Sequence, residues 1–562
     1  MNILGISCFY HDSAACLVQG TEVVAAVEEE RLTRRKHDRD YPRMAIDSCL
    51  QQGGITGRDV DLVVFYEKPL LKLQRVLASA PSAGAEADDV LHRHVSTYVN
   101  ETLTLEQTVR EQLGKDVPFQ YCEHHLSHAA SAFYPSPYEE AAILTVDGVG
   151  EWCTTAQWTG SGIDITNVRE IHYPDSLGML YSAMTAYLGF KVNNDEYKVM
   201  GLASYGERTL EKQIREMIEL HEDGSFQLNM DYFTFTESRS RMYSEKLIEL
   251  LGPERQKSDP ITARHMAIAG SLQSVTEEAM LNLARQAKVS SGADHLCMAG
   301  GVAYNCVANA RVLEELGYKG VWIQPAAGDS GGAVGAALYA AYQDAGKRTP
   351  SDQYSTSLGP SFNNDEIREV LVAEGVEFEE FDDEALCERT AELISESFII
   401  GWFQGRMEFG PRALGNRSIL ANATDPDMKD VLNARVKFRE DFRPFAPAVA
   451  EERFRDYFEI EQKSPYMLFT PRVRPDHREG LPSITHADGT ARVQTVNADQ
   501  NPRFHRTIRA FEKIGGRAVV INTSFNVNGE PIVCTPLDAV RCFLGTDIDY
   551  LVIGNYIVSK PF

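Results

Sequence analysis

The amino-acid sequence predicts an α/β fold with parallel strands, divided into two domains. Short apolar segments alternate with segments of helical periodicity over the first 345 residues, and glycine-rich turns join a strand to a helix at residues 294–317 and 321–346. A polar stretch rich in Pro, Ser, Gly and Asn then interrupts the pattern at residues 345–362. The 562 residues also exceed the usual size of one domain. We therefore expect domains at residues 1–350 and 360–562.

Individual segments support this division. Residues 1–30 predict three short strands joined by turns, because ILGIS and ACLVQG are apolar and FYHDSAA between them is polar. Helical periodicity follows at residues 41–52 and 84–116, and residues 118–134 change from a strand end to a helix. Residues 141–160 repeat the strand–turn–strand opening. In the second domain, the sequence predicts a helix after residue 362 and strands within residues 396–420, 516–529 and 550–558.

Composition excludes several classes of protein. The 81 acidic residues outnumber the 55 Lys and Arg residues, so the net charge of −26 disfavours a nucleic-acid partner. No apolar run approaches the ~20 residues of a membrane span, and the N-terminus lacks the pattern of a signal peptide. The ten cysteines show no C-x-x-C pair, which is typical of reduced thiols. We expect a cytoplasmic protein with no membrane partner, and a homodimer stays open.

A pair of histidines predicts a metal site. His124 and His128 are four residues apart, so both imidazoles lie on one face of a helix. Asp147 and Asp329 each follow a strand beside glycine, and two His with two Asp suit Fe(II), Mn(II) or Zn(II). Two alternatives stay open here: His125 replaces His124 as a ligand, or the aspartates only form turns and helix caps.

The strand-to-helix turns and the first turn supply further candidates. Backbone N–H groups at glycines can bind phosphate, although no Walker pattern is present and close helix packing explains the same glycines. The candidates are Gly300, Gly301, Gly328 and Gly331. His11 lies in the first turn, where it can act as a general base or merely cap the backbone. Lys36 and His37 either bind an anion or belong to a solvated run of charge.

Arginine, lysine and asparagine side chains predict an anion site in the second domain. The planar guanidinium suits bidentate recognition of phosphate or carboxylate, and these cations gather in short glycine-containing segments of an acidic chain. The alternative is pairing with Glu408, Glu440 and Asp441. The candidates are Arg406, Arg412, Arg417, Lys437, Arg443, Arg492, Asn522, Ser524 and Asn526.

Ten segments in order along the chain resemble one family, the O-carbamoyltransferases that include nodulation protein U and the cephamycin and tobramycin carbamoyltransferases. The segments are FYHDSAACLV, EEERLTRRKH, EHHLSHAASAFY, VDGVGE, KVMGLASYG, AGGVAYNC, GDSGGAVGAA, GRMEFGPRALGNRSIL, FRPFAP and NTSFNVNGEPIV. The resemblance implies an N-terminal domain of the actin/sugar-kinase/heat-shock-70 superfold. It also implies a smaller α/β C-terminal domain resembling threonylcarbamoyl-adenylate synthase.

The resemblance further implies a reaction. Carbamoyl phosphate and ATP would form a carbamoyl-adenylate in the C-terminal domain, and the carbamoyl group would pass to a hydroxyl of a small acceptor, a natural product or a sugar. His11 would accept the hydroxyl proton and Lys36 would lie near the transferred group. A divalent metal, Fe(II) with Mn or Zn as alternatives, would bind His124, His128, Asp147 and Asp329, and Mg would accompany ATP. The nucleotide-binding residues would be Lys198, Gly300, Gly301, Asn305, Gly328 and Gly331.

Three other functions are weighed against this one. A tRNA-modifying carbamoyl or threonylcarbamoyl transferase conflicts with the charge of −26. A plain ATPase or kinase of the same superfold does not need the C-terminal arginines, and an inactive binding protein does not need His11 or the metal candidates. The segments 66–116 and 208–262 are expected to shape the acceptor pocket, but they do not indicate the acceptor.

Overall fold

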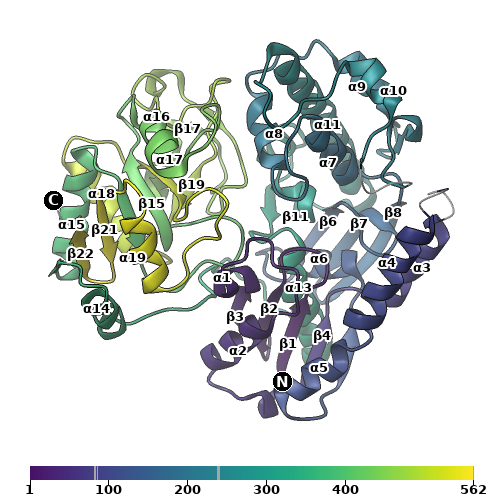
Figure 1. Ribbon diagram of the computed structural model, residues 1–562, viewed down its shortest axis with the longest axis horizontal. Helices are drawn as coiled ribbons and strands as arrows, with labels where there is room; N and C mark the ends of the chain where they lie inside the picture. The colour runs from purple at the N-terminus through teal and green to yellow at the C-terminus, as the bar shows by residue number, and fades with distance from the viewer. Residues whose placement is uncertain (81–83, 85–86, 237–240, 561–562) are drawn as a thin grey trace. The chain divides into compact units, whose positions relative to one another are not determined.

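The computed structural model describes residues 1–80, 84, 87–236 and 241–560, without the side chains of residues 89, 90, 93 and 94. The chain divides into two compact units, which are described separately (Figure 1). Unit 1 contains residues 1–29 and 37–354, and unit 2 contains residues 30–36 and 355–562. The main division therefore falls inside the polar stretch at 345–362. The segment 30–36, expected in the first domain, instead belongs to unit 2.

Segment 30–36 belongs to unit 2 because its side chains bind there. Arg31 donates to the carbonyl of Gly410, at 2.9 Å, and Arg34 donates to the carbonyls of Pro531 and Ile532. Leu32 packs against a small buried cluster of Met407, Ile532 and Cys534. Local periodicity does not report such distant contacts, so the sequence could not assign this segment.

Unit 1 contains two five-stranded sheets with the same topology. The first has the order β3-β2-β1-β4-β5 and the second, in reverse, β8-β7-β6-β11-β12. In each sheet three consecutive strands form an antiparallel meander and two later strands add in parallel, so the expected parallel sheet is mixed. The strands are β1 (Asn2–Ser7), β2 (Ala14–Gln19), β3 (Glu22–Glu28), β4 (Leu62–Phe65), β5 (Phe119–Tyr121), β6 (Glu140–Val146), β7 (Cys153–Ser161), β8 (Asp164–His172), β11 (His295–Ala299) and β12 (Gly320–Ile323).

Helices α6 (His124–Phe133) and α13 (Asp329–Ala345) lie between these two sheets (Figure 1). Helix α13 packs on β1, β2 and β4, and α6 packs on β6 and β11. The two helices approach closely because a Cβ on Gly335 would lie 1.8 Å from the carbonyl oxygen of Ser127. Only glycine allows this contact, and the contact holds the N-terminal ends of both helices at the site.

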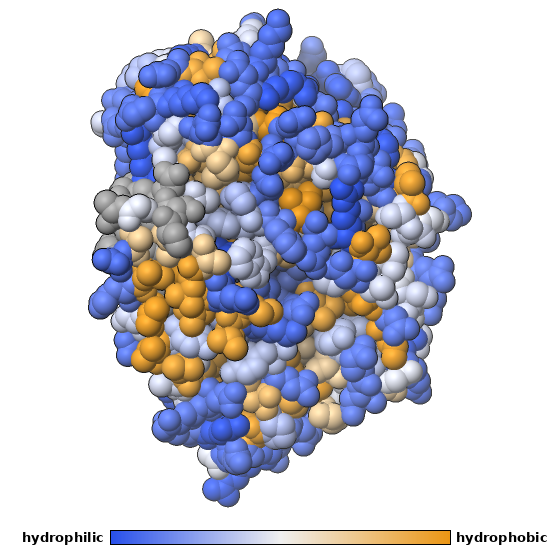
Figure 2. All heavy atoms as spheres, turned by 90° about the vertical axis from the view of Figure 1, so that its right-hand side faces the viewer, coloured by the Kyte–Doolittle hydropathy of each residue, from blue (hydrophilic) through white to orange (hydrophobic). Residues whose placement is uncertain are grey.

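Further helices cover the two sheets, and those of the crossover from β4 to β5 expose apolar side chains to solvent. The crossover from β4 to β5 contains α3 (Pro69–Ser79), α4 (Ala87–Thr97) and α5 (Leu105–Leu113), and the last two fall within residues 84–116, where helix was expected. Leu70, Leu77 and Leu103 in this crossover are exposed, and Figure 2 shows apolar side chains gathered on this face. The remaining elements of unit 1 are α2 (Arg43–Gln52), α7 (Leu177–Tyr187), α8 (Glu196–Ala203), α9 (Glu211–Met217), β9 (Ile218–Leu220), β10 (Phe226–Leu228), α10 (Glu245–Leu251), α11 (Ala263–Ser291) and α12 (Cys306–Glu315). Helix α1 (Glu29–Thr33) belongs to unit 2 from Glu30 onward.

Unit 2 is built on one eight-stranded sheet of order β13-β22-β21-β14-β15-β20-β16-β19. Only the pairs β14–β21 and β16–β19 are parallel. Its strands are β13 (Phe378–Glu380), β14 (Ile400–Phe403), β15 (Arg417–Asn422), β16 (Ala446–Ala450), β19 (Gln494–Val496), β20 (Val519–Ser524), β21 (Tyr550–Ile553) and β22 (Tyr556–Ser559), with β17 (Phe458–Glu459) and β18 (Arg472–Val473) as a separate pair. Its helices are α14 (Asn364–Ala373), α15 (Asp383–Ser395), α16 (Met428–Leu432), α17 (Phe454–Tyr457), α18 (Pro502–Lys513) and α19 (Pro536–Leu544).

Two whole-chain properties accompany the fold. All ten cysteines are buried and free of disulfide bonds. Within the described residues, no helix combines the length and apolar character needed to cross a lipid bilayer.

Replacing Gly335 by alanine tests the approach of α13 to α6. The new methyl group meets backbone rather than a movable side chain, so we expect a loss of ~1–3 kcal/mol of stability. Urea unfolding followed by tryptophan fluorescence measures the loss. Gly148→Ala is the matched control because a Cβ there meets nothing within 4 Å. Equal stability of the two variants would contradict the packing argument.

Candidate functional site

Two histidines of α6 and two aspartates converge between the sheets of unit 1. The Nε2 atoms of His124 and His128 are 3.1 Å apart, because four residues bring side chains onto one helix face. Asp147 follows β6, and its Oδ2 lies 3.0 Å from His124 Nε2. Asp329 begins α13, and its Oδ1 lies 3.6 Å and 3.7 Å from the two Nε2 atoms. The structure thus brings together the four residues expected to bind a metal.

The surroundings hold these side chains rigidly. The carboxylate of Glu151 accepts the backbone N–H of His124, at 3.0 Å, and so caps the first turn of α6. The Oδ1 atom of Asp147 accepts the backbone N–H of Gly301 at 2.9 Å. His125 faces away, with its Nδ1 2.8 Å from Thr145 Oγ1. Helix phase therefore excludes the alternative ligand pair His125 and His128.

The electrostatics of the cluster suit a bound cation. Burial opposes ionisation of Asp147, yet hydrogen bonds from His124 and His128 hold the pKa of this carboxyl well below its usual value. Burial also opposes the charged form of His128, but Asp147 and Asp329 raise its pKa to about 9. The Oδ2 atom of Asp329 is buried without a hydrogen-bond partner. Two imidazoles and two carboxylates around one point form a donor set that fits a divalent ion.

His11 lies beside this cluster in the turn between β1 and β2. Its Nε2 is 3.9 Å from Asp329 Oδ2, and its Nδ1 is 3.0 Å from Asp12 Oδ2. Although burial opposes the charged form, Asp329 and Asp12 raise the pKa of His11 to about 10. The sequence offered His37 as an anion ligand or as part of a solvated run of charge, but it did not predict that His37 Nδ1 lies 2.7 Å from Asp12 Oδ1. His37 lies within the charged run at residues 31–40, so its sequence neighbours suggested exposure to solvent rather than a specific partner.

The glycine-rich turns serve close packing in this structure. A Cβ on Gly300 would lie 2.2 Å from the carbonyl oxygen of Val146, and one on Gly331 would lie 1.9 Å from that of Ala326. The N–H of Gly300 is bound by the Ala327 carbonyl and that of Gly328 by the Tyr304 hydroxyl. The packing explanation therefore accounts for these glycines, and a role in nucleotide binding stays a prediction.

Two other nucleotide-binding candidates also have partners inside unit 1. The Asn305 side chain caps α12 by accepting the Ala308 N–H, and its amide pairs reciprocally with Gln273. Lys198 is buried and its Nζ lies 3.2 Å from Asp195 Oδ1.

In unit 2, Lys437 is a buried cation held by the loop that follows β20. Its Nζ donates to the carbonyl oxygens of Ser524 and Asn526 and lies 3.1 Å from Asn526 Oδ1. Burial lowers its pKa well below the usual value, and Arg439, Arg443 and Lys36 act in the same direction. Lys36 therefore lies among the cations that act on Lys437, and we call this group the positive region of unit 2 (Lys36, Lys437, Arg439 and Arg443). A group of cations that repel one another is typical of a site for an anion.

The predicted arginines differ in what they contact. Arg417 is fully buried, and its guanidinium donates to the carbonyls of Gln404, Asn416 and Pro360 and stacks on a phenylalanine. It supports the fold rather than presenting charge to a ligand, because these carbonyls occupy its donors. Arg406 similarly donates to the carbonyls of Leu358 and Gly359.

Arg412 lies in the loop that joins β14 to β15, and the next two residues of this loop contact Asn522 of β20 and Gln494 of β19. Arg412 is half-buried, and its buried Nε has no hydrogen-bond partner among the described residues. Asn522 donates to the carbonyl of Ala413, the next residue, and to Gln494 Oε1, while its own Oδ1 is buried without a partner. Arg412 therefore has donor capacity for an anion. The sequence missed Gln494, which no charge or motif marks.

Three further predicted residues belong to unit 2. Arg443 lies 3.6 Å from Glu440, so the expected pairing with that acid exists. The Ser524 hydroxyl donates to Asn526 Oδ1 at 2.6 Å. Arg492 is half-buried, and with burial it helps to lower the pKa of His486 to about 4.

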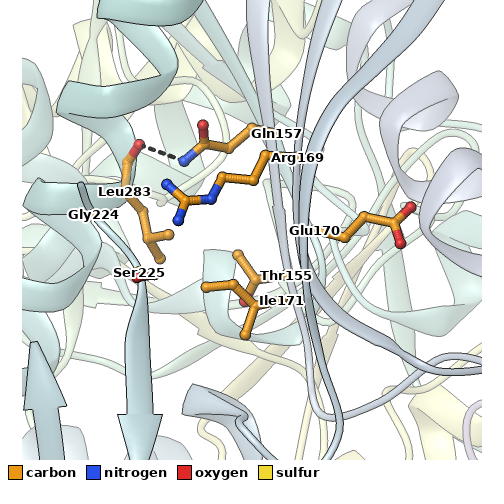
Figure 3. Close-up of a pocket in the computed structure, with 8 residues that line it drawn as sticks. All are labelled: Thr155, Gln157, Arg169, Glu170, Ile171, Gly224, Ser225 and Leu283. Carbon is orange, nitrogen blue, oxygen red and sulfur yellow. Dashed lines mark hydrogen bonds between the residues drawn. The ribbon is translucent and has the colours of Figure 1, made fainter. Parts of the chain in front are cut away.

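A surface crevice elsewhere in unit 1 does not belong to this site. Its lining includes Gln157, Arg169 and Glu170 of the second sheet and the turn at Gly224 (Figure 3). Arg169 is already paired with Asp223, and Glu170 points away from it. None of the predicted site residues lines this crevice.

Comparison with known protein families identifies an N-terminal and a C-terminal domain, in the order that the sequence resemblance implies. The model of the carbamoyltransferase N-terminus matches residues 2–338, and that of the carbamoyltransferase C-terminus matches residues 391–560. The chain is 46% identical to the uncharacterized protein sll1178 of Synechocystis, over 100% of this chain and 97% of that protein. It is 39% identical to nodulation protein NolNO of Sinorhizobium fredii, over 98% of this chain and 79% of that protein.

Among solved structures, HypF of T. kodakarensis is similar at a TM-score of 0.31 and 14% identity, over 61% of this chain and 48% of that one, which is too little to support an argument. The two family models and the two relatives cover nearly all of the sequence in order. The actin/sugar-kinase type of fold expected for the N-terminal part is consistent with the duplicated sheet of unit 1. The chain belongs to the carbamoyltransferase family.

Proposed function

We propose that this enzyme is an O-carbamoyltransferase that uses carbamoyl phosphate and ATP to carbamoylate a hydroxyl of a small acceptor, a natural product or a sugar. The observation that carries the proposal is the cluster of His124, His128, Asp147 and Asp329 with His11 beside it, in a chain of this family. This geometry combines a cation site with a group that can bind a hydroxyl proton.

The first step requires that anions be held close together. Water cleaves carbamoyl phosphate to carbamate and phosphate, and a carbamate oxygen then displaces pyrophosphate from ATP to form carbamoyl-adenylate. Arg412 of unit 2 would bind the phosphoryl oxygens, because its buried Nε has no hydrogen-bond partner among the described residues. Lys437, whose ammonium is held by oxygens of Ser524 and Asn526, would add positive charge to the same unit. Mg would accompany ATP.

The second step requires a proton acceptor at the hydroxyl. The acceptor oxygen attacks the carbamoyl carbon, AMP leaves, and His11 Nε2 would take the proton. The neutral ring that this requires would be favoured when a cation offsets the charges of Asp329 and Asp147, which raise the pKa of His11 against the opposing effect of burial. His124, His128, Asp147 and Asp329 would hold a divalent ion, Fe(II) with Mn or Zn as alternatives. When bound, that ion would supply Lewis-acid stabilisation of negative charge. The exclusion of water by the buried walls would protect the adenylate from hydrolysis.

Loss of Arg412 tests the first step. With ATP and carbamoyl phosphate, we expect the native protein to release AMP and pyrophosphate, and Arg412→Ala to be slower by ~100-fold or more. Coupled assays for pyrophosphate and chromatography of the nucleotides measure both products. Arg368→Ala, on an exposed position of α14, is the matched control. Formation of ADP without pyrophosphate would instead indicate the kinase or ATPase, and co-purification of tRNA would indicate the nucleic-acid modifier.

Removal of a ligand tests the metal site. We expect the purified protein to bind ~1 divalent ion per chain, and His128→Ala and Asp329→Asn to bind far less, because each removes a donor. Elemental analysis after dialysis against Fe(II), Mn(II) or Zn(II) gives the content. His172→Ala, on an exposed histidine of β8, should keep the ion. Full occupancy in both ligand variants would place the ion elsewhere.

A further inference from the structure

The carboxylate of Asp12 joins two histidines of unit 1. Its Oδ2 lies 3.0 Å from Nδ1 of His11, and its Oδ1 lies 2.7 Å from Nδ1 of His37. Burial opposes the charge on Asp12, but the hydrogen bonds from both imidazoles hold the pKa of this carboxyl far below its usual value. Both histidines must therefore carry a proton on Nδ1, because an ionised carboxylate only accepts hydrogen bonds.

The contact at Nε2 of His37 determines whether this ring is charged. Its Nε2 lies 2.6 Å from Asn194 Oδ1, and the amide nitrogen of Asn194 donates to Asp195 Oδ1. The acidic neighbour orients the amide, so its oxygen and not its nitrogen faces His37. Since acceptors lie at both ring nitrogens, His37 is doubly protonated and positively charged. Lys198 in turn holds Asp195, with its Nζ 3.2 Å from Asp195 Oδ1.

The backbone is constrained at the same residues. Asp12 and His37 have φ angles of 52° and 56°, in the left-handed region that residues other than glycine rarely adopt. Such conformations persist where surrounding contacts outweigh their cost. The backbone N–H of Ser13 donates to the Asp38 carbonyl, and that of Phe9 donates to the Arg39 carbonyl, so the two turns are joined directly.

We propose that Asp12 and His37 are positioning residues for His11. Asp12 holds the Nδ1–H of His11, which directs Nε2 toward Asp329, and the positive charge of His37 balances the negative charge of Asp12. This inference rests on the proposed function, in which His11 Nε2 takes the proton of the acceptor hydroxyl. A carboxylate that fixes the ring and tautomer of a histidine base is a general means of preparing that base.

Nitrogen NMR of the full chain tests the arrangement. The protein, labelled with ¹⁵N in its histidine rings and treated with EDTA, is compared with His11→Gln and His37→Gln to assign the two signals. We expect Nδ1 of His11 to be protonated and both nitrogens of His37 to be protonated at neutral pH. In Asp12→Asn, His37 should lose its second proton and the His11 signals should shift. Asp344→Asn, on an exposed position of α13, should leave them unchanged.

Two results would overturn the proposal. One is a His11 ring protonated on Nε2 with Nδ1 bare, and the other is an Asp12→Asn spectrum in which neither histidine changes. The wild-type spectrum decides the first point even if Asp12→Asn does not fold. The signature reports proton positions, which a side chain with only a structural role would not set.

A separate assay distinguishes failure of this inference from failure of the proposed function. Hydroxylamine attacks carbamoyl-adenylate without a general base and gives hydroxyurea and AMP, measured against a blank without ATP. We expect equal hydroxyurea from the native protein and Asp12→Asn, and a loss in Arg412→Ala. No hydroxyurea from the native protein would reject the adenylate step, while the NMR result would still decide the role of Asp12. A loss in Asp12→Asn alone would show that Asp12 acts on adenylate formation and would overturn the positioning role.

Discussion

The close backbone contact between α13 and α6 is the constraint on which the site of unit 1 depends. The four ligand candidates come from a helix, a strand end and a second helix, and 182 positions separate Asp147 from Asp329. Gly335 lets α13 lie against the Ser127 carbonyl, which places Asp329 within 4 Å of both histidines. A larger residue would push the helices apart and separate the carboxylate from the imidazoles.

The burial of charge follows from that contact. Two carboxylates enclosed between sheets are costly unless cations or hydrogen bonds compensate them, and His124, His128 and His11 supply both. The same logic extends outward through Asp12 to His37, where each charge lies next to its opposite. Unit 2 shows the reverse arrangement, since Lys437 lies among other cations and is held by carbonyl oxygens. The first arrangement fits a cation and the second fits an anion.

Glycine illustrates how one sequence feature supports two explanations. Turns such as AGG and GDSGG are typical of phosphate binding and also of close packing. In the structure, Gly300 and Gly331 face backbone oxygens at distances that no Cβ could occupy. Packing alone therefore requires glycine at these positions, and a bound phosphate would be an additional role.

The sequence by itself determined the elements that local patterns control. Alternating apolar segments predicted β1 to β3, the i, i+4 spacing placed His124 and His128 on one face of α6, and the polar stretch near residue 350 located the division of the chain. Period and composition act over a few residues, so one sequence suffices to read them.

Only the tertiary structure decided which distant residues meet. It joined Asp12 to His37, assigned segment 30–36 to unit 2, buried Arg417 among carbonyls and left Arg412 with an unpartnered donor. It also made the sheets mixed rather than parallel. These outcomes depend on contacts between residues far apart in the chain, and no local period or composition carries that information.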